Sequence, residues 1–247
     1  MKESVKKLSE MILQCERIVF FGGAGVSTES GVKDYRSEDG LYQTVKEYGV
    51  SPEVILSHSF FFAKPEIFYD FYRKYFISSA LPNDAHRALA KLEEMGKLTA
   101  VITQNIDSLH QKAGSKEVIE LHGNASKFHC VGCSSVTPDD AVISAITKGL
   151  VPKCPHCGSL MKPKVVLYEE PLYPGVAEGA ISHIESAQML IVGGTSLKVY
   201  PAASFVDYFR GKYLVIINRE ETSFDKRADL VISEKIGQVM KEVITQL

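Results

Sequence analysis

Short apolar runs alternate along the chain with segments in which apolar residues recur every three or four positions. The first such segment places Val5, Leu8, Ile12 and Cys15 on one face, which predicts an amphipathic helix with Ser4 as its N-cap. Cys15 falls on the apolar stripe of this helix, so we expect a small buried side chain rather than a reactive thiol.

Five later apolar runs have the length of buried strands, and each ends in glycine or polar residues. The runs and their exits are 18–21 before Gly22-Gly23-Ala24-Gly25, 98–103 before Gln104-Asn105-Ile106-Asp107, 119–121 before His122-Gly123, 189–192 before Gly193-Gly194-Thr195-Ser196, and 213–217 before Asn218. Ligands bind outside the carboxyl ends of strands in open parallel sheets, so we expect these exits to line one crevice. The alternation of strands and helices, which continues with a strand at 230–232 and a helix at 237–247, predicts a three-layer α/β fold.

Two helices are predicted between the first two strands. One carries an aromatic face, since its aromatic positions are spaced by three and four: Phe68, Phe71, Tyr72 and Tyr75. The next begins at an N-cap provided by Asn83 or Asp84 and stops at Gly96, with Ala85, Leu89 and Leu92 on its apolar side. His86 lies in the first turn of this second helix, and we expect it to be structural rather than catalytic.

Composition narrows the class of protein. The chain has 247 residues, of which 45% are hydrophobic and 23% are charged, as in ordinary globular proteins. A net charge of −2 gives no electrostatic reason to expect nucleic acid or an anionic membrane as the main partner. No apolar run reaches the length of a membrane span, and the first ten residues are too polar for a signal peptide. We therefore expect a cytoplasmic protein, and no surface stripe argues for an oligomer, so we expect a monomer.

Four of the five cysteines form two CxxC pairs, Cys130 with Cys133 and Cys154 with Cys157. Two such knuckles present four thiolates to one ion, which is typical of a tetrahedral zinc site. Iron also accepts four thiolates, but zinc is the commoner occupant of such closed sites. Four sulfur ligands leave no open position for a substrate, so the metal is expected to be structural. His129 and His156 lie beside the knuckles, and we expect both at the surface.

The stretch 101–123 holds the strongest candidate for catalysis, because it places an amide pair, a carboxylate and a histidine at two strand exits. Histidine has an unperturbed pKa of about 6.5, which suits a general base near neutral pH, so His122 is the candidate base. The glycine-rich turn at 22–25 could let backbone amides approach a pyrophosphate. That turn is a weak signal by itself, because the usual final glycine of the dinucleotide fingerprint is absent.

Taken together, these motifs resemble those of the sirtuins, the NAD-dependent protein-lysine deacylases, over nearly the whole chain. The matching segments are Gly23-Ala24-Gly25-Val26-Ser27 with Ser30-Gly31, Asp34-Tyr35-Arg36, Thr103 to Asp107, Leu121-His122-Gly123, the four cysteines, Pro163 to Glu170, Gly194-Thr195-Ser196 with Pro201-Ala202-Ala203, and Asn218. The likeness is to the compact bacterial forms. It implies a Rossmann-like parallel-sheet domain at 1–31, 78–123 and 165–247, and a smaller domain with a helical module at 32–77 and a zinc module at 124–164.

The resemblance also implies an activity. NAD would be consumed as a co-substrate, and an acetylated protein or peptide would be the partner. The acetyl oxygen would attack C1′ of the nicotinamide ribose and expel nicotinamide, leaving an alkylimidate. His122 would then act as general base on a ribose hydroxyl, and the products would be free lysine, nicotinamide and O-acetyl-ADP-ribose. No metal would touch the substrate, because the one zinc would be structural.

Roles for single residues follow from the resemblance alone. The cofactor-binding set would comprise Gly23, Ala24, Gly25 and Thr28 in the first loop, Tyr35 and Arg36 after it, Gln104, Asn105, Ile106 and Asp107 after the second strand, and Gly194, Thr195, Ser196 and Asn218 in the second half. Asn105 and Asp107 would hold the nicotinamide carboxamide. The segment Val165, Val166, Leu167 and Tyr168 would offer a backbone edge to which the substrate peptide adds as a strand.

Several positions depart from the family pattern. Gly22 replaces a hydroxyl residue, Lys33 a proline, Tyr35 a phenylalanine and Glu169 the glycine of the usual FGE. Glu169 therefore leaves the peptide preference open. The tyrosine and arginine, three residues apart, of succinyl-removing sirtuins are absent here: Tyr75 follows Tyr72, and Arg73 is out of register.

A carboxylate on the acyl chain would thus lose its bidentate partner, so acetyl or other uncharged acyl groups are favoured. The alternatives are a deacylase for longer uncharged acyl groups, a mono-ADP-ribosyltransferase and a non-catalytic NAD-sensing module. His122 argues against the transferase, and the intact strand exits argue against the sensor.

Overall fold

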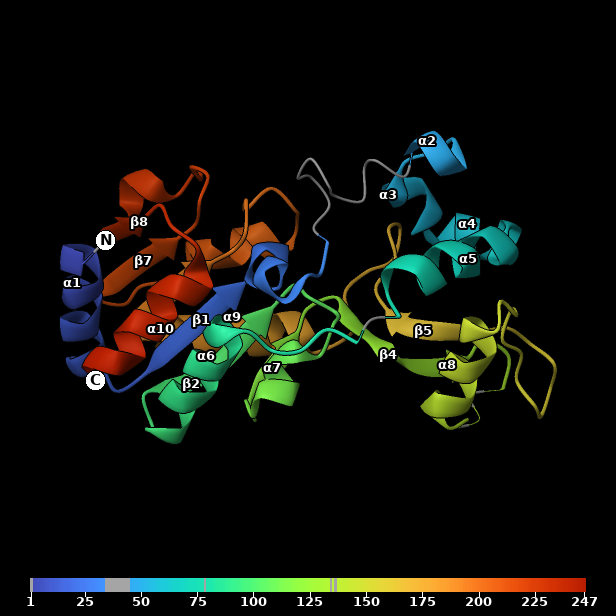
Figure 1. Cartoon of the computed structure of the whole chain (residues 1–247), viewed down its shortest axis with the longest axis horizontal. Helices are drawn as coiled ribbons and strands as arrows, with labels where there is room; N and C mark the ends of the chain where they lie inside the picture. Colours follow the sequence, from blue (N-terminus) through green and yellow to red (C-terminus); the bar gives the residue numbers. More distant parts are fainter. Residues whose placement is uncertain (1, 34–44, 78, 134, 136) are drawn as a thin grey trace.

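The computed structural model describes residues 2–33, 45–77, 79–133, 135 and 137–247. Its elements form two parts that lie side by side along the longest axis, with both chain termini at the far end of the first part (Figure 1). The first part is built on a parallel sheet and the second on a short antiparallel sheet with helices around it. No helix in the described part of the chain is long and apolar enough to cross a membrane.

A parallel sheet forms the centre of the first part. Its strands are β1 (Ile18–Gly22), β2 (Leu98–Thr103), β3 (Val118–Glu120), β6 (Met189–Gly193), β7 (Tyr213–Ile217) and β8 (Leu230–Ile232). They lie in the order β3-β2-β1-β6-β7-β8, and every neighbouring pair is parallel. The strands β2 and β3 thus follow one another on one side of β1, and β6, β7 and β8 follow one another on its other side. This is the doubly wound order, with its switch point beside β1. The predicted α/β fold with a parallel sheet is confirmed.

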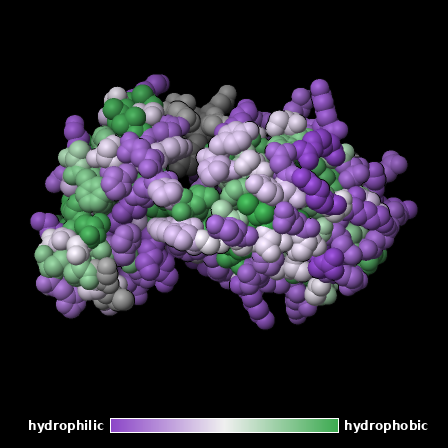
Figure 2. All heavy atoms as spheres, turned by 180° about the vertical axis from the view of Figure 1, so that it is seen from behind, coloured by the Kyte–Doolittle hydropathy of each residue, from purple (hydrophilic) through white to green (hydrophobic). Residues whose placement is uncertain are grey.

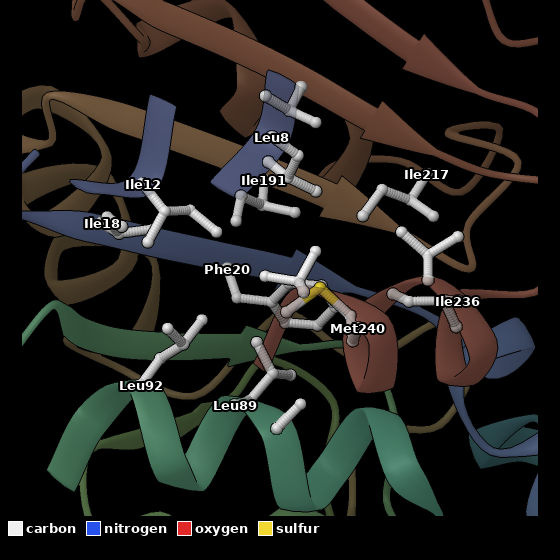
Figure 3. Packing of buried hydrophobic residues seen from close by; sticks show 14 of the residues in the cluster. Leu8, Ile12, Ile18, Phe20, Leu89, Leu92, Ile191, Ile217, Ile236 and Met240 are labelled. Carbon is white, nitrogen blue, oxygen red and sulfur yellow. The ribbon is translucent and has the colours of Figure 1, made fainter. Parts of the chain in front are cut away.

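Helices cover both faces of this sheet. Ile18 and Phe20 of β1 pack with α1 (Lys2–Leu13), α6 (Asp84–Glu94) and α10 (Ile236–Gln246), as Figure 3 shows from close by. Val19 and Phe21 point to the opposite face, which α9 (Val176–Ser186) and the 3-10 segment η4 (Ala202–Tyr208) cover. This alternation buries both faces of β1 completely, which explains its uninterrupted apolar run.

The helix predictions hold except at one boundary. Asn83 caps α6, and a capping box with His86 completes the turn. Cys15 is buried, as predicted. Ser4 is not a cap, because α1 already begins at Lys2 and Ser4 lies inside its first turn. Helical periodicity identifies the buried face of a helix but does not determine where its first turn begins.

The second part packs helices against β4 (Gly123–Cys130) and β5 (Met161–Val165), which are antiparallel. Its helices are α2 (Val45–Tyr48), α3 (Pro52–Ile55), α4 (His58–Ala63), α5 (Pro65–Tyr75) and α8 (Asp139–Thr147). The predicted aromatic face of α5 forms much of a separate hydrophobic cluster. Tyr69 and Tyr72 each donate a hydroxyl hydrogen bond to the sheet, to the carbonyl oxygens of Met161 and Ala125. These bonds fix α5 on the sheet.

The remaining described elements are short. They are η1 (Ala24–Val26), η2 (Thr28–Ser30), α7 (Leu109–Ala113) and η5 (Asp225–Arg227). From behind, polar residues cover most of the surface, and smaller hydrophobic areas lie among them (Figure 2). The segments η1 and η2 follow β1, and α7 follows β2. These three elements therefore lie at the carboxyl edge of the sheet, where the candidate residues gather (Figure 1).

Candidate active site

The loops after β1 and β6 lie in direct contact at the switch point. The Gly25 amide donates a 2.8 Å hydrogen bond to the Gly194 carbonyl, and the Gly23 amide donates one of 3.3 Å to Gly193. A Cβ at Gly25 would come within 2.8 Å of the Gly194 backbone, and one at Gly23 within 2.8 Å of the Thr195 Cβ. Glycine is therefore required for this close approach, and it leaves a backbone-lined cradle of the kind that accepts a pyrophosphate.

The loop after β2 crosses this junction. The Gln104 amide donates a 3.0 Å hydrogen bond to the Gly22 carbonyl, and its side-chain nitrogen donates one of 3.1 Å to the Thr195 hydroxyl. The same hydroxyl accepts from the Leu197 amide at 3.2 Å. Residues from the exits of β1, β2 and β6 are thus held together by hydrogen bonds, although they lie far apart in the sequence.

His122 lies two residues after the end of β3, beside this junction. Its Nδ1 is 3.1 Å from the Gln104 carbonyl oxygen, which can only accept a hydrogen bond. Nδ1 must therefore carry the proton, and in the neutral ring the lone pair lies on Nε2. Burial lowers the pKa of His122, and the bond to Gln104 opposes this only in part. His122 is consequently a neutral imidazole with a basic Nε2 near neutral pH, which is the form that a general base requires.

Ser27 joins the loops after β1 and β2. Its hydroxyl donates a 2.7 Å hydrogen bond to Asp107 Oδ2 and accepts a 3.0 Å bond from Asn105 Nδ2. The other oxygen of Asp107 accepts from the Leu109 amide at 2.9 Å. Ser27 is almost completely buried, yet sequence reasoning did not select it. Its position in the first matching motif was the only available signal, because its partners lie about 80 residues further along the chain.

Other predicted cofactor residues take less direct places. The Thr28 hydroxyl donates to the Gly25 carbonyl at 3.0 Å, so it braces the glycine loop. Ile106 packs toward the second part and accepts the Ala125 amide at 2.9 Å through its carbonyl. Asn218 follows β7, but its side-chain Nδ2 donates to the Glu220 carbonyl of its own turn at 2.8 Å.

Ala24 opens η1 in the glycine loop, and Ser196 lies two residues after Gly194. The predictions for Tyr35 and Arg36 lie outside the described residues.

The predicted substrate segment, 165–168, is attached to both parts. The Val166 amide donates to the carbonyl of His122 at 2.9 Å. The Tyr168 amide donates to the Leu56 carbonyl, and the Tyr168 carbonyl accepts from the His58 amide, each at 3.0 Å. These backbone groups are therefore already paired within the chain. So are the Leu167 amide and carbonyl, which bond to the Glu170 carboxylate and amide, and the Val165 carbonyl, which accepts from Lys162 Nζ. Val165 and Leu167 are buried, whereas the Tyr168 side chain is exposed.

Glu169 follows this segment in a conformation that favours glycine. Its φ is +77°, in the left-handed region. Its carboxylate accepts from the backbone amide and the hydroxyl of Ser59, at 2.8 and 2.9 Å, at the start of α4. The departure noted in the sequence is thus a real strain at this turn, offset by two hydrogen bonds to the helical part.

The four cysteine sulfurs lie within 4.8 Å of one another. The Sγ atoms of Cys130 and Cys157 are 3.4 Å apart, and that of Cys133 lies 3.6 Å from the Sγ atoms of both Cys130 and Cys154. This arrangement fits a single tetrahedral zinc held by four thiolates. His156 is exposed, as expected. The prediction for His129 was wrong: it is partly buried, because β4 pairs with β5 at this position, where it faces Lys162.

Comparisons with known proteins agree with this arrangement. Residues 23–201 match the Sir2 family. A protein of Clostridium perfringens named NAD-dependent protein deacetylase is 53% identical over 246 residues, which cover 99% of this chain and all of that protein. A Staphylococcus aureus protein of the same name is 40% identical over the full length of both chains.

Solved structures give the same result. A structure described under the mechanism and regulation of Sir2 enzymes superposes with a TM-score of 0.91, at 38% identity, over 100% of this chain and 98% of the other. One of Sir2 with a p53 peptide and NAD⁺ gives a TM-score of 0.86 at 38% identity, over 98% of each chain.

Proposed function

The chain belongs to the Sir2 family, and on that premise we propose that it is an NAD-dependent protein-lysine deacetylase that transfers the acetyl group to ADP-ribose and releases nicotinamide. The observation that carries the proposal is the tautomer of His122. Its Nδ1–H is committed to the Gln104 carbonyl, so a basic Nε2 is available where the exits of the central strands meet. A sensor module that only binds NAD would have no use for a base held in this form.

Each loop has a separate task in the proposed reaction. Gly23, Ala24 and Gly25, with Gly194 and Thr195, bring backbone close to a pyrophosphate. NAD, when bound there, supplies an activated ribose carbon to which the acetyl oxygen adds as nicotinamide leaves. We place Gln104 at the ribose hydroxyls, Asn105 and Asp107 at the nicotinamide carboxamide, and Ile106 at the wall of that pocket. Thr28 and Ser196 would support the phosphate loops, and Asn218 would lie at the adenosine end. Tyr35 and Arg36 are proposed as further cofactor-binding residues.

His122 takes a proton from a ribose hydroxyl at Nε2 in the second stage. The proton charges the ring, and the Gln104 carbonyl stabilises that charge through Nδ1–H. Because burial lowers the pKa of His122, the base is neutral at pH 7 and becomes protonated only below its ordinary value of 6.5. Deacetylation is therefore expected to decline on the acid side of pH 6.5 and to be insensitive to this group above it.

We propose acetylated protein or peptide segments as partners, added as a strand along the segment 165–168. The helix α5 offers no cation to a charged acyl chain at the positions considered. Arg73 pairs with Asp70, and the hydroxyl of buried Tyr72 is bound to the Ala125 carbonyl. These pairings support a preference for acetyl or other uncharged acyl groups.

We also propose that the chain divides into a Rossmann-like domain, 1–31, 78–123 and 165–247, and a smaller domain, 32–77 and 124–164. The separate hydrophobic clusters of the two parts support this division. The zinc would hold the smaller domain together without touching the substrate. We further propose a monomer, since one chain supplies every group in the scheme, and the cytoplasm as its compartment, since a four-thiolate site suits a reducing environment.

The test is mass spectrometry of an acetyl-lysine peptide incubated with the protein, with and without NAD. The acetyl group should be lost only with NAD, and O-acetyl-ADP-ribose should appear in equal amount. His122→Ala should slow that loss by about 100-fold or more, the usual contribution of a general base, whereas His183→Ala on α9 serves as a matched histidine control. If NAD is split while the peptide keeps its acetyl group, the deacetylase proposal is refuted, and label on protein would indicate ADP-ribosyl transfer.

A further inference from the structure

Lys162 lies within β5 and is the only lysine or arginine that is buried among the described residues, with 5% of its surface exposed. Its Nζ donates two hydrogen bonds of 2.9 Å, one to the Glu170 carboxylate and one to the Val165 carbonyl oxygen. Removal of an ammonium from water is unfavourable unless its partners are held in good geometry. No step of the proposed reaction uses this lysine, so its burial calls for another explanation.

The Glu170 carboxylate receives donors from three separate elements. Its Oε2 accepts from Lys162 of β5 and from the Leu167 amide, each at 2.9 Å. Its Oε1 lies 2.8 Å from Nδ1 of His58, at the start of α4. Burial by itself raises the pKa of Glu170, but the bonds from His58, Leu167 and Lys162 outweigh it and hold the pKa below its ordinary value. The carboxylate is therefore charged and fixed in place by three donors.

The same carboxylate closes the turn that ends the proposed peptide segment. The Glu170 amide donates to the Leu167 carbonyl at 3.0 Å, while the Leu167 amide donates to the Glu170 side chain, so residues 167–170 are closed on both sides. The amide of His58 donates to the carbonyl of Tyr168 within this turn at 3.0 Å. His58 thus holds the turn through its backbone and through its ring.

Lys162 acts on both ends of the segment 165–168 together. Val165, to whose carbonyl it donates, is the first residue of the segment, and Glu170 closes the turn that follows it. One buried ammonium therefore sets the distance between the start of the segment and its turn. A peptide that adds as a strand pairs through backbone groups, so its binding depends on how the backbone of this segment is presented.

We propose that Lys162 is a positioning residue for peptide binding: its ammonium, joined to Val165 and Glu170, holds the segment 165–168 in the conformation to which the acetylated peptide adds. This inference rests on the proposed function, because it assigns a use to the peptide side of the same site. Lys162 is too deeply buried to touch the peptide, and it acts through the two residues that it joins.

The effect of Lys162 should be confined to the peptide side. The hydrogen bonds given above for Lys162 and Glu170 reach β5, the turn 167–170 and α4, and none of them reaches the glycine loops proposed to hold the pyrophosphate. Loss of the ammonium should therefore change the KM for the acetyl peptide without a matching change in the KM for NAD.

Four full-length variants separate positioning from stability. Lys162→Met keeps an unbranched side chain but removes the ammonium, and Lys162→Arg keeps the charge and offers several donors. The double variant Lys162→Met with Glu170→Gln removes both charges, so no carboxylate is left without its partner. Lys164→Met is the matched control, because Lys164 lies on the same strand and is exposed. Each is compared with the parent in kcat, the KM for the acetyl peptide, the KM for NAD and the midpoint of thermal unfolding.

For Lys162→Met, we expect the peptide KM to rise about tenfold, the effect of losing a hydrogen bond between charged groups. The KM for NAD and kcat should stay within about twofold of the parent. The unfolding midpoint should fall as well, because the Glu170 charge loses its partner. Lys162→Arg should restore the peptide KM to within about threefold of the parent, and Lys164→Met should leave every value unchanged.

The double variant decides between the two roles. Its midpoint should recover toward that of the parent, whereas its peptide KM should stay raised about tenfold, because the segment still lacks the ammonium. If Lys162→Met does not fold, the double variant is read in its place.

The proposal is overturned if the peptide KM recovers together with the midpoint, if the KM for NAD rises in parallel, or if Lys162→Arg is as poor as Lys162→Met. An unchanged peptide KM in a parent that deacetylates refutes the positioning role alone, whereas a parent that fails to deacetylate refutes the proposed function itself.

Discussion

His110 offers a direct test of the buried polar interior beside the site. It lies in α7 with 1% of its surface exposed, and neither ring nitrogen has a hydrogen-bond partner among the described residues. Its ring contacts those of His86 and Phe20, with centroids 4.7 and 6.1 Å away. Burial, with a smaller contribution from His86, lowers the pKa of His110 to about 3. The His110 ring is therefore neutral in the folded protein at any pH well above about 3.

The sign of the resulting pH dependence follows from linkage. The folded pKa lies below the ordinary value of 6.5, so the unfolded chain binds the proton first as the pH falls. Stability is therefore fully present above about pH 6.5 and is lost as the pH falls from there toward the folded pKa. At pH 5 the chain is about 1.5 units below the unfolded pKa, and at about 1.36 kcal/mol per unit His110 alone costs about 2 kcal/mol of unfolding free energy.

The perturbation is His110→Met, which removes the titrating ring and fills the space with an unbranched apolar side chain. At pH 7 we expect stability within about 1 kcal/mol of the parent or better, because a buried polar group without partners is replaced by an apolar one. Between pH 7 and pH 5 the variant should lose about 2 kcal/mol less than the parent. Other groups titrate alike in both proteins, so they cancel in this difference.

The assay is urea unfolding at the two pH values, with Leu109→Met as the control. Leu109 is the preceding residue of α7 and is equally buried, but it does not titrate. The control should follow the pH dependence of the parent whatever its own stability. If His110→Met and the parent lose the same free energy between pH 7 and pH 5, His110 is not held neutral by burial, and the reasoning fails.

Three further predictions concern the loops and the metal. Both Glu169→Ala and Glu169→Gly lose the bonds to Ser59, but only glycine relieves the strain of the left-handed backbone. In thermal unfolding the Ala variant should therefore be about 1–2 kcal/mol less stable than the Gly variant. Equal stability would mean that the turn carries no strain. Gly25→Ala forces a Cβ to 2.8 Å from the Gly194 backbone, so the KM for NAD should rise at least about tenfold while the peptide KM holds; an unchanged KM for NAD would exclude the cradle. Elemental analysis should find one zinc per chain, and Cys130→Ser should lower both zinc content and the unfolding midpoint; full zinc in the variant would contradict the four-thiolate site.

Much of the fold could be predicted because the sheet is parallel and buried on both faces. Each strand must then be apolar throughout, and each must end where polar residues begin, so β1 and β2 are visible as runs in the sequence. The four-cysteine cluster could also be predicted from the sequence, because the ligand spacing within each CxxC knuckle is local. Helix starts are less constrained, since capping is only one of several ways to satisfy the first amides. That is why α1 begins before the predicted Ser4 cap.

The network around Ser27 could not be predicted, for a physical reason. Its members come from the exit of β1, the start of α6 and the exit of β2, and they meet only once the sheet order is established. Each member has an ordinary local explanation in the sequence: Ser27 ends a glycine loop, and His86 completes a capping box. The hydrogen bonds that join these residues depend on neighbours in three dimensions, which the local sequence does not specify.

The place of His122 explains how the two parts can share one reaction centre. The His122 side chain is hydrogen-bonded to the Gln104 carbonyl. Gln104 is in turn hydrogen-bonded to Gly22 and Thr195 on the proposed NAD side. The carbonyl of His122 holds Val166 on the proposed peptide side, and Gly123 comes directly after His122. A Cβ at Gly123 would lie 2.0 Å from the Lys164 carbonyl oxygen, so only glycine lets β4 and β5 come together this closely. The proposed base is thus anchored to both parts through His122 itself, so a shift of either part would change its distance to both proposed substrates.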